Sequence, residues 1–190
     1  VITPMPIVEN PFETQALIPE ILPSHPKRPL EVRYPDLRIE PGCFATPTQV
    51  REPPAVVDWD AENDQLYTVM MIDPDAPQRE RPTNRDWLHW LVINVPGDHI
   101  SQGQTIAEYI GSAPPKGSGK HRYILAVFQQ PGKIQPTDVK HLSKHQAKGR
   151  AKFATIPFLE RNKLAGPLAA TFFQAEWDNA VPAIYQQLTE

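Results

Sequence analysis

The chain has one cysteine, no membrane-length apolar run and no strong excess of charge, and each shortage excludes a class of protein. A single thiol, Cys43, cannot form an intramolecular disulfide framework or a cysteine-rich zinc module. No apolar run approaches the roughly 18 residues of a membrane span, and no Asn-x-Ser/Thr glycosylation site occurs. The 19 basic and 22 acidic residues nearly balance, which argues against nucleic-acid binding. We therefore expect a soluble, cytoplasmic protein without a metal or other cofactor.

Glycine is also scarce, at nine residues, whereas proline is abundant, at 23 of 190. The usual share of proline is about 5%. Proline lacks a backbone donor and fixes φ, so this composition disfavours long helices and favours short strands and ordered loops. The length predicts one domain over residues 1–190, with a proline-rich arm, residues 1–29, packed on it. We expect a monomer.

Four segments have the pattern of strands. Residues 30–34 alternate apolar and polar side chains, which is typical of a half-buried strand. The runs 66–72, 88–95 and 122–128 are apolar, rich in β-branched and aromatic residues, and bounded by Pro, Gly or Asp, as buried strands are. No convincing helical period lies between them, so antiparallel pairing is favoured over βαβ crossovers.

Two later segments carry other patterns. Residues 178–188 predict a short helix with Asp178 and Asn179 as caps, Pro182 in its first turn and an apolar stripe that ends at Leu188. Between Lys140 and Lys152 there are five basic residues and no acidic one; if this segment is helical, Lys140, Lys144 and Lys148 share a face. A solvated surface explains this basic segment most simply. Peripheral contact with an anionic membrane, or with an acidic partner, is the alternative.

Polar side chains gather at the ends of the three apolar strands. Asp73 and Asp75 follow the first strand, His89 lies inside the second, and His121 and Tyr123 lie where the third begins. Each alone has an ordinary explanation as a turn residue or a core histidine. Their coincidence favours a functional site, because ionisable groups beside buried strands must be paired or have shifted pKa values.

Four kinds of site can be compared with these residues. A P-loop fails, because Gly119-Lys120 is followed by His121 instead of Ser or Thr. A metal site has suitable ligand types but no supporting spacing, and nucleophilic hydrolysis lacks a Gly-x-Ser-x-Gly elbow. The fourth is a cavity for a small anion, in which imidazole, phenol and backbone groups donate to oxygens.

Longer motifs resemble those of a known family. They are Asp73-Pro-Asp-Ala-Pro77, Asn84-Arg-Asp-Trp-Leu-His-Trp90 and Gly111-Ser-Ala-Pro-Pro-Lys-Gly-Ser-Gly-Lys-His-Arg-Tyr123. With Gln174-Ala-Glu-Trp177 and the segment around Tyr185, they span most of residues 20–188. In extent and order they resemble the phosphatidylethanolamine-binding protein family, which includes Raf kinase inhibitor proteins, plant flowering regulators and a yeast carboxypeptidase inhibitor.

The resemblance implies a mainly β fold: an antiparallel sandwich with a large central sheet, a smaller sheet and a few peripheral helices, one of them C-terminal. It also implies a pocket for phosphate or a phospholipid head group such as phosphorylethanolamine. The residues that it assigns to ligand binding are Asp73, Asp75, Trp87, His89, Pro114, Pro115, His121, Tyr123 and Tyr185. It further implies a gate formed by Pro182 and Tyr185 and a cis bond at Ala76–Pro77.

The function expected from this resemblance is non-enzymatic binding that modulates signalling through protein partners. The alternatives are an inhibitor of a kinase or serine protease that uses another surface, and a hydrolase that uses the Asp/His cluster. In the pocket, we expect Asp73 to orient and charge an imidazole, so that His89 or His121 donates to the anion. Asn84 and Ala113 depart from residues frequent in the family, which changes the rim of the pocket.

Overall fold

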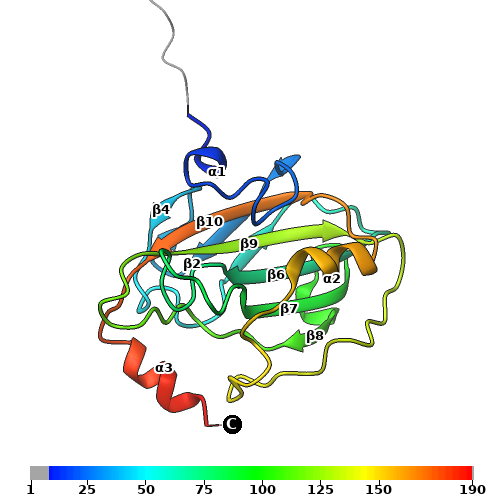
Figure 1. Cartoon of the computed structure of the whole chain (residues 1–190). Coiled ribbons are helices and arrows are strands. Elements are labelled where there is room, and N and C mark those ends of the chain that lie inside the picture. The colour runs from blue at the N-terminus through cyan, green and yellow to red at the C-terminus, as the bar shows by residue number, and fades with distance from the viewer. Residues whose placement is uncertain (1–8, 190) are drawn as a thin grey trace, which may run out of the picture.

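The computed structural model describes residues 9–189 and arranges their strands in two sheets (Figure 1). The large sheet contains, in spatial order, β1 (Arg28–Pro29), β10 (Ala169–Ala175), β9 (His121–Gln129), β6 (Leu66–Asp73), β7 (Trp87–Pro96) and β8 (Gln104–Ala107), and β4 (Cys43–Phe44) also pairs with β10. The smaller sheet contains β3 (Leu37–Arg38), β2 (Glu31–Tyr34) and β5 (Val56–Asp58). These sheets confirm the predicted mainly β fold.

The helices are short, as the proline content predicts. They are α1 (Pro11–Thr14), the 3-10 helix η1 (Ile100–Gln102), α2 (Thr155–Arg161) and α3 (Val181–Gln187). The C-terminal helix α3 confirms the prediction for residues 178–188, although Ala180 is its N-cap and no side chain caps it. In residues 9–189 no helix is long and apolar enough to cross a membrane. The cytoplasmic location stays a prediction.

Pairing in the large sheet is antiparallel at its centre and parallel at one side. β6 is antiparallel to both β7 and β9, and β9 is antiparallel to β10. The short strands β1 and β4, however, both pair with β10 in parallel. The prediction of antiparallel pairing is therefore correct for the long apolar strands and wrong for these two. Both strands lie in the N-terminal part of the chain, far in sequence from β10, so no short hairpin requires them to be antiparallel to it.

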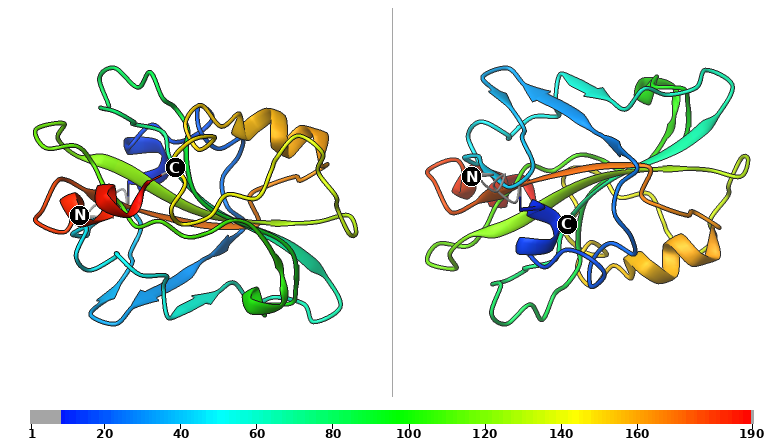
Figure 2. Two further views of the ribbon diagram at one scale, coloured as in Figure 1. Left: turned by 90° about the horizontal axis from the view of Figure 1, so that it is seen from below. Right: turned by 90° about the horizontal axis from the view of Figure 1, so that it is seen from above.

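Alternation along the central strands divides the apolar core into two layers. Tyr67, Val69 and Met71 pack with the smaller sheet, whereas Met70 and Ile72 pack with the layer that contains α2 and the N-terminal segment. Figure 2 shows the smaller sheet and α2 on opposite sides of the large sheet. Since successive side chains point to opposite faces, the neighbours at the start of β9, His121 and Arg122, are delivered to different layers.

The described part of the N-terminal arm packs on the α2 side of the large sheet. Phe12, Leu17 and Leu22 are buried there, and the ring of Phe12 meets that of Phe172 edge-on at 5.3 Å. Burying such a side chain contributes about 1.5–3 kcal/mol. Residues 1–8 of the predicted arm lie outside the described residues.

The structure also decides the conformation of the basic segment, for which the sequence left a helix open. The basic segment from Lys140 to Lys152 is turns and loops, so its lysines do not share a helical face. Its backbone instead pairs with the main body, where Leu142 forms a parallel bridge with Ala107, the last residue of β8. The helix α2 and the strand β10 were not anticipated at all.

Candidate functional site

The antiparallel order of β7, β6 and β9 brings the predicted polar residues to one end of the large sheet. Because β6 runs opposite to both neighbours, its last residue, Asp73, lies beside the first residues of β7 and β9. Asp73 is opposite Trp87, and His89 follows two residues later. On the other side of β6, β9 begins at His121. Segments distant in sequence thus converge through strand register.

A cavity of about 360 Å³, here called the strand-end cavity, lies at this end. Its volume falls within the range of about 300–1,000 Å³ typical of small-molecule sites. The predicted residues that line it are Asp73, Trp87, His89, Pro115, His121, Tyr123 and Tyr185. The other lining residues are Ala76, Pro77, Asn84, Ile110, Ala113, Ala147 and Leu188. The predicted residues Asp75 and Pro114 are buried outside this lining.

Asp73 and His121 form a buried pair at the floor of the cavity. His121 Nδ1 lies 2.8 Å from Asp73 Oδ2, and the opposite ring nitrogen, Nε2, lies 2.9 Å from Ser118 Oγ. The Ser118 hydroxyl donates to the carbonyl of Pro115 at 2.7 Å, so it accepts from Nε2 of His121. Burial raises the pKa of Asp73, and the bond to His121 opposes this rise. The predicted contact between Asp73 and an imidazole is confirmed, and His121 supplies it.

His89 is the neutral one of the two histidines, of which either was expected to donate to the anion. Its Nδ1 lies 2.7 Å from the carbonyl oxygen of Ile110, which can only accept, so Nδ1 carries the proton. Burial lowers the pKa of His89 to about 3, and the nearby positive charge of Arg150 contributes. The ring is therefore neutral, with Nε2 as an acceptor. His89 can accept from a ligand's hydroxyl or ammonium group, but it is not the charged donor, so of the two histidines expected for that role only His121 remains.

This neutral histidine predicts a specific dependence of stability on pH. A histidine whose pKa falls from 6.5 in the unfolded chain to about 3 in the folded protein stabilises the fold above pH 6.5. That contribution is lost as pH falls, by up to about 1.4 kcal/mol per pH unit. The free energies of unfolding of the wild type and His89→Gln can be measured in urea between about pH 7.5 and about pH 4.5. The difference between the two free energies should become smaller as the pH falls. Asp86, whose pKa burial raises to about 6, acts with opposite sign but is present in both proteins. A difference independent of pH would contradict this assignment.

Tyr123 places an unsatisfied hydroxyl beside the buried pair. Its side chain is fully buried, and its ring lies between Phe173, at 5.3 Å, and His121, at 6.1 Å. Within the described chain its hydroxyl oxygen forms no hydrogen bond of normal geometry, although the Asp73 carboxylate lies near enough to interact with it. Burial raises the pKa of this phenol well above its ordinary value, and the negative charge of Asp73 adds to the effect. The phenol therefore stays protonated and is an available donor.

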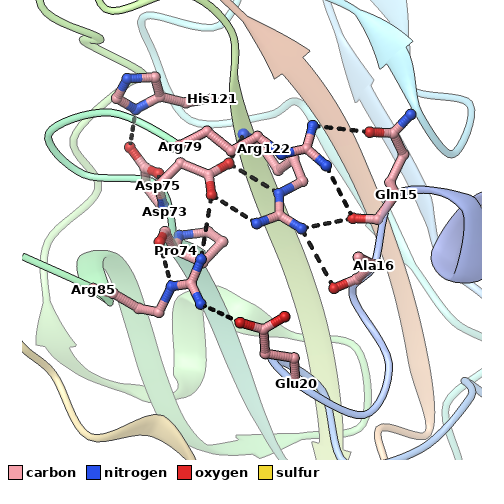
Figure 3. Close-up of polar contacts among 10 residues, drawn as sticks. All are labelled: Gln15, Ala16, Glu20, Asp73, Pro74, Asp75, Arg79, Arg85, His121 and Arg122. Atoms are coloured by element: carbon pink, nitrogen blue, oxygen red, sulfur yellow. Dashed lines mark hydrogen bonds and ion pairs between the residues drawn. The ribbon is translucent and has the colours of Figure 1, made fainter. Parts of the chain in front are cut away.

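Asp75 does not line the cavity, and Figure 3 shows its contacts with Arg122 and Arg85 instead. Both of its carboxylate oxygens accept from the guanidinium of Arg122, at 2.9 and 2.7 Å. Arg122 also donates to the carbonyl of Gln15, at 2.6 Å, while Arg85 joins the carbonyl of Pro74 to the carboxylate of Glu20. This network ties the turn after β6 to β9 and to the N-terminal arm. It explains why two acidic residues in one motif have different roles.

A buried arginine that the sequence did not single out forms part of the cavity's support. Arg150 is fully buried and lies 5.6 Å from the centre of the Trp87 ring. Its guanidinium donates to backbone carbonyls of three separate segments, those of Leu88, Glu108, Ser143 and Gln146. Burial lowers its pKa to about 10, so it remains charged at neutral pH. A single basic residue in a basic loop gave no signal that it would turn inward.

The C-terminal helix covers one side of the opening. The hydroxyl of Tyr185 donates to the carbonyl of Ala113 at 2.7 Å, and the side chain remains 45% exposed. The predicted cis bond at Ala76–Pro77 is confirmed at another part of the lining. Tyr185 thus lies at the boundary between cavity and solvent, as a gate requires.

Comparison with known proteins agrees with this fold. Residues 35–173 match the family model described as phosphatidylethanolamine-binding protein. The chain belongs to the phosphatidylethanolamine-binding protein family. A curated relative from Drosophila melanogaster, described as putative odorant-binding protein A5, is 43% identical over 182 residues, which cover 95% of this chain and 86% of the relative.

Solved structures extend the comparison to the fold of this family member. The solution structure of the protein CG7054 is 35% identical, with a TM-score of 0.74, over 92% of this chain and 98% of the other. A carboxypeptidase Y inhibitor, solved with its cognate proteinase, is 22% identical, with a TM-score of 0.72, over 88% and 94% of the two chains. A phosphatidylethanolamine-binding protein from Plasmodium vivax is 21% identical, with a TM-score of 0.70, over 88% and 96%.

Proposed function

We propose that this protein is a non-enzymatic binding protein whose strand-end cavity takes a small anion of the phosphate or phosphorylethanolamine type. The observation that supports this most strongly is the buried hydroxyl of Tyr123, which lies near the carboxylate of Asp73 and forms no hydrogen bond of normal geometry in residues 9–189. A buried donor without a partner costs about 1–3 kcal/mol, so a ligand oxygen that accepts from it recovers this free energy. The neighbouring Nε2 of His89 accepts, which suits the ammonium or a protonated oxygen of the same ligand.

The electrostatic balance of the cavity also favours an anion. At about 6 Å and an effective dielectric near 20, an unpaired carboxylate would repel an anion by about 3 kcal/mol. His121, bonded to Asp73 at 2.8 Å, offsets this repulsion when the pair carries two protons between its imidazole and carboxylate. The charged guanidinium of Arg150 behind Trp87 adds positive potential. A ligand oxygen would replace the hydroxyl of Ser118 as the acceptor for Nε2 of His121.

Tyr123→Phe tests the proposal directly. Calorimetric titration with phosphorylethanolamine should give at least about tenfold weaker binding than the wild type, because a hydrogen bond to a charged group contributes about 1.5–3 kcal/mol. Tyr67→Phe is the matched control, since Tyr67 is also buried in the large sheet but does not line the cavity. Equal affinities for wild type and Tyr123→Phe, with both folded by circular dichroism, would rule out the phenol as a ligand donor.

Affinity for the anion should rise as pH falls. Burial raises the pKa of Asp73, and deprotonation of this carboxyl places a negative charge in the same cavity, which disfavours an anion there. Titrations with inorganic phosphate and with a sulfonate, whose charge does not change, between about pH 5.5 and about pH 8 separate the protein's protonation from that of the ligand. If the affinity for the sulfonate did not change with pH, the protonation of Asp73 and His121 would not control anion binding.

Partners would engage the protein through this anion site. A carboxypeptidase Y inhibitor of the same fold was solved with its proteinase, and a kinase or protease remains a proposed partner class here. Competition distinguishes a partner bound at the cavity from one bound at another surface. Free phosphorylethanolamine should displace the first kind and leave the second bound.

A second candidate function, ester hydrolysis, rests on the contacts of Ser118. Its Oγ lies 2.9 Å from Nε2 of His121, whose Nδ1 lies 2.8 Å from Asp73, as in a Ser–His–Asp triad. In such a reaction Oγ would attack the ester carbonyl, His121 would pass the Ser118 proton to the leaving alkoxide, and water would then release the acid. The hydroxyl is instead donated to Pro115, so we favour binding.

One variant separates these two functions. Ser118→Ala should leave phosphorylethanolamine affinity equal to that of the wild type or higher, because a competing acceptor for His121 is removed. If the protein is a hydrolase, the same change should abolish turnover of p-nitrophenyl acetate by the purified protein. Turnover by the wild type that disappears in Ser118→Ala would replace the binding proposal with the catalytic one.

A further inference from the structure

A second cavity lies across a thin wall from the strand-end cavity. Its volume is about 670 Å³, and it is here called the basic-rim cavity. Trp87, His89 and Ala147 line the first cavity, whereas their neighbours Leu88, Gln146 and Lys148 line the second. The guanidinium of Arg150 holds this wall together by donating to carbonyls of both β7 and the segment 142–146. The two cavities are therefore separate sites.

The floor of the basic-rim cavity is apolar. Leu88, Ile106 and Leu142 are buried members of the core layer on the α2 side, and the half-buried Phe153 and Val139 pack against the same layer. Gly149 has φ of +95°, and a Cβ there would meet the side chain of Leu142 at 3.2 Å. Glycine at this turn therefore leaves the apolar floor uncovered.

The rim of the same cavity is cationic. Lys140, Lys148 and Lys152 are exposed, and none of them forms an ion pair with any residue of the range 9–189. The remaining charges of the rim, Arg161 and Asp138, neutralise each other in a salt bridge. The basic segment noted in the sequence thus presents three unpaired ammonium groups above an apolar floor.

We propose that the basic-rim cavity binds a single-chain amphipathic anion, of the class of fatty-acid carboxylates. The alkyl chain lies against Leu88, Leu142 and Phe153, and the carboxylate lies among the three lysines. This arrangement combines the favourable removal of apolar surface from water with charge complementarity at a solvated rim. It adds a ligand class to the proposed function and does not depend on the anion proposed for the strand-end cavity.

Chain length and head-group charge provide the first test. Calorimetric titration below the micelle concentration should show affinity rising from octanoate to decanoate to dodecanoate, by up to about fourfold for each CH₂. Dodecyltrimethylammonium, with the same chain and the opposite charge, should bind at least about tenfold more weakly than dodecanoate. Equal binding of the two head groups would overturn the proposal.

Filling the cavity provides the second test. Ala151→Trp introduces a large side chain at an exposed position of the lining, and should abolish dodecanoate binding. Ala165→Trp is the matched control, because Ala165 is also exposed but lies outside this cavity. Both variants should keep the melting temperature and phosphorylethanolamine affinity of the wild type. Unchanged dodecanoate binding in Ala151→Trp would place the fatty acid elsewhere.

Charge removal distinguishes a soluble amphiphile from a membrane. Replacing Lys148 and Lys152 by Gln should weaken the binding of dodecanoate about fivefold, whereas Lys133→Gln, outside the rim, should not.

Saturating phosphorylethanolamine should leave the affinity for dodecanoate unchanged, so failure of this proposal and failure of the anion proposal are distinguishable. The proposal would be wrong if the wild type floated with phosphatidylserine vesicles, the double variant did not, and the wild type bound no dodecanoate. The ligand of this cavity would then be an anionic bilayer.

Discussion

Asp75→Ala is expected to lower the free energy of unfolding by about 3–5 kcal/mol, because it leaves the guanidinium of Arg122 buried without a counter-charge. The Arg122 side chain is 3% exposed and that of Asp75 is 0% exposed, so water cannot replace the lost partner. Two hydrogen bonds between their side chains, and a third from the backbone N–H of Arg122 to Asp75, also hold the turn after β6 against β9. Urea unfolding at neutral pH measures the change.

Two comparisons determine whether this loss comes from the buried pair. Glu40→Ala removes an exposed carboxylate from its ion pair with Arg38 and should cost less than about 1 kcal/mol. Asp75→Leu combined with Arg122→Met should cost less than the two single changes added together, since neither charge is then left alone. A loss below about 1 kcal/mol for Asp75→Ala would contradict the structural role of Asp75.

Arg150→Met should have the second large effect, on both stability and ligand binding. Removal of the guanidinium leaves carbonyl oxygens of β7 and the 142–146 segment without their donor, and each buried acceptor left unsatisfied costs about 1–3 kcal/mol. The predicted loss in free energy of unfolding is about 3 kcal/mol or more. Phosphorylethanolamine binding should also weaken, since the wall carrying Trp87 and Ala147 loses its support.

Arg150→Lys and Arg161→Met give the matched controls for this prediction. Lysine retains the charge but not the planar set of donors, so it should restore only part of the stability. Arg161 is exposed and paired with Asp138, and its replacement should change the free energy of unfolding by less than about 1 kcal/mol. If Arg150→Met unfolded at the same urea concentration as the wild type, the buried contacts of Arg150 would carry no net stability.

The elements predicted correctly are those whose local pattern agrees with their final environment. The apolar runs 66–72, 88–95 and 122–128 became β6, β7 and β9, whose residues are almost all buried. Both faces of these strands are covered in the structure, so nearly every residue in them is apolar. A continuous apolar run in the sequence therefore predicts them. The helix α3 was also predictable, since its residues Val181 and Ile184 repeat at helical spacing and are buried.

The elements that were missed lack an unambiguous local signal. β10 consists of Ala169–Ala175, in which alanines on both sides of the strand-forming Thr171, Phe172 and Phe173 make the local signal mixed. It is a strand because β9 pairs with it along its whole length, a contact between distant residues. The helix α2 contains Pro157 within its first turn, where proline is tolerated. In a sequence, however, the same proline is also typical of a loop.

The sequence by itself determined the family, the three buried strands and the residue types that meet at their ends. Only the tertiary structure decided that Asp73 pairs with His121 while Asp75 turns to Arg122, because neighbours on one strand enter opposite layers. It also decided that His89 is neutral and that Arg150 lies inside. Protonation and burial depend on groups brought together from distant segments, and no local pattern of residues contains that information.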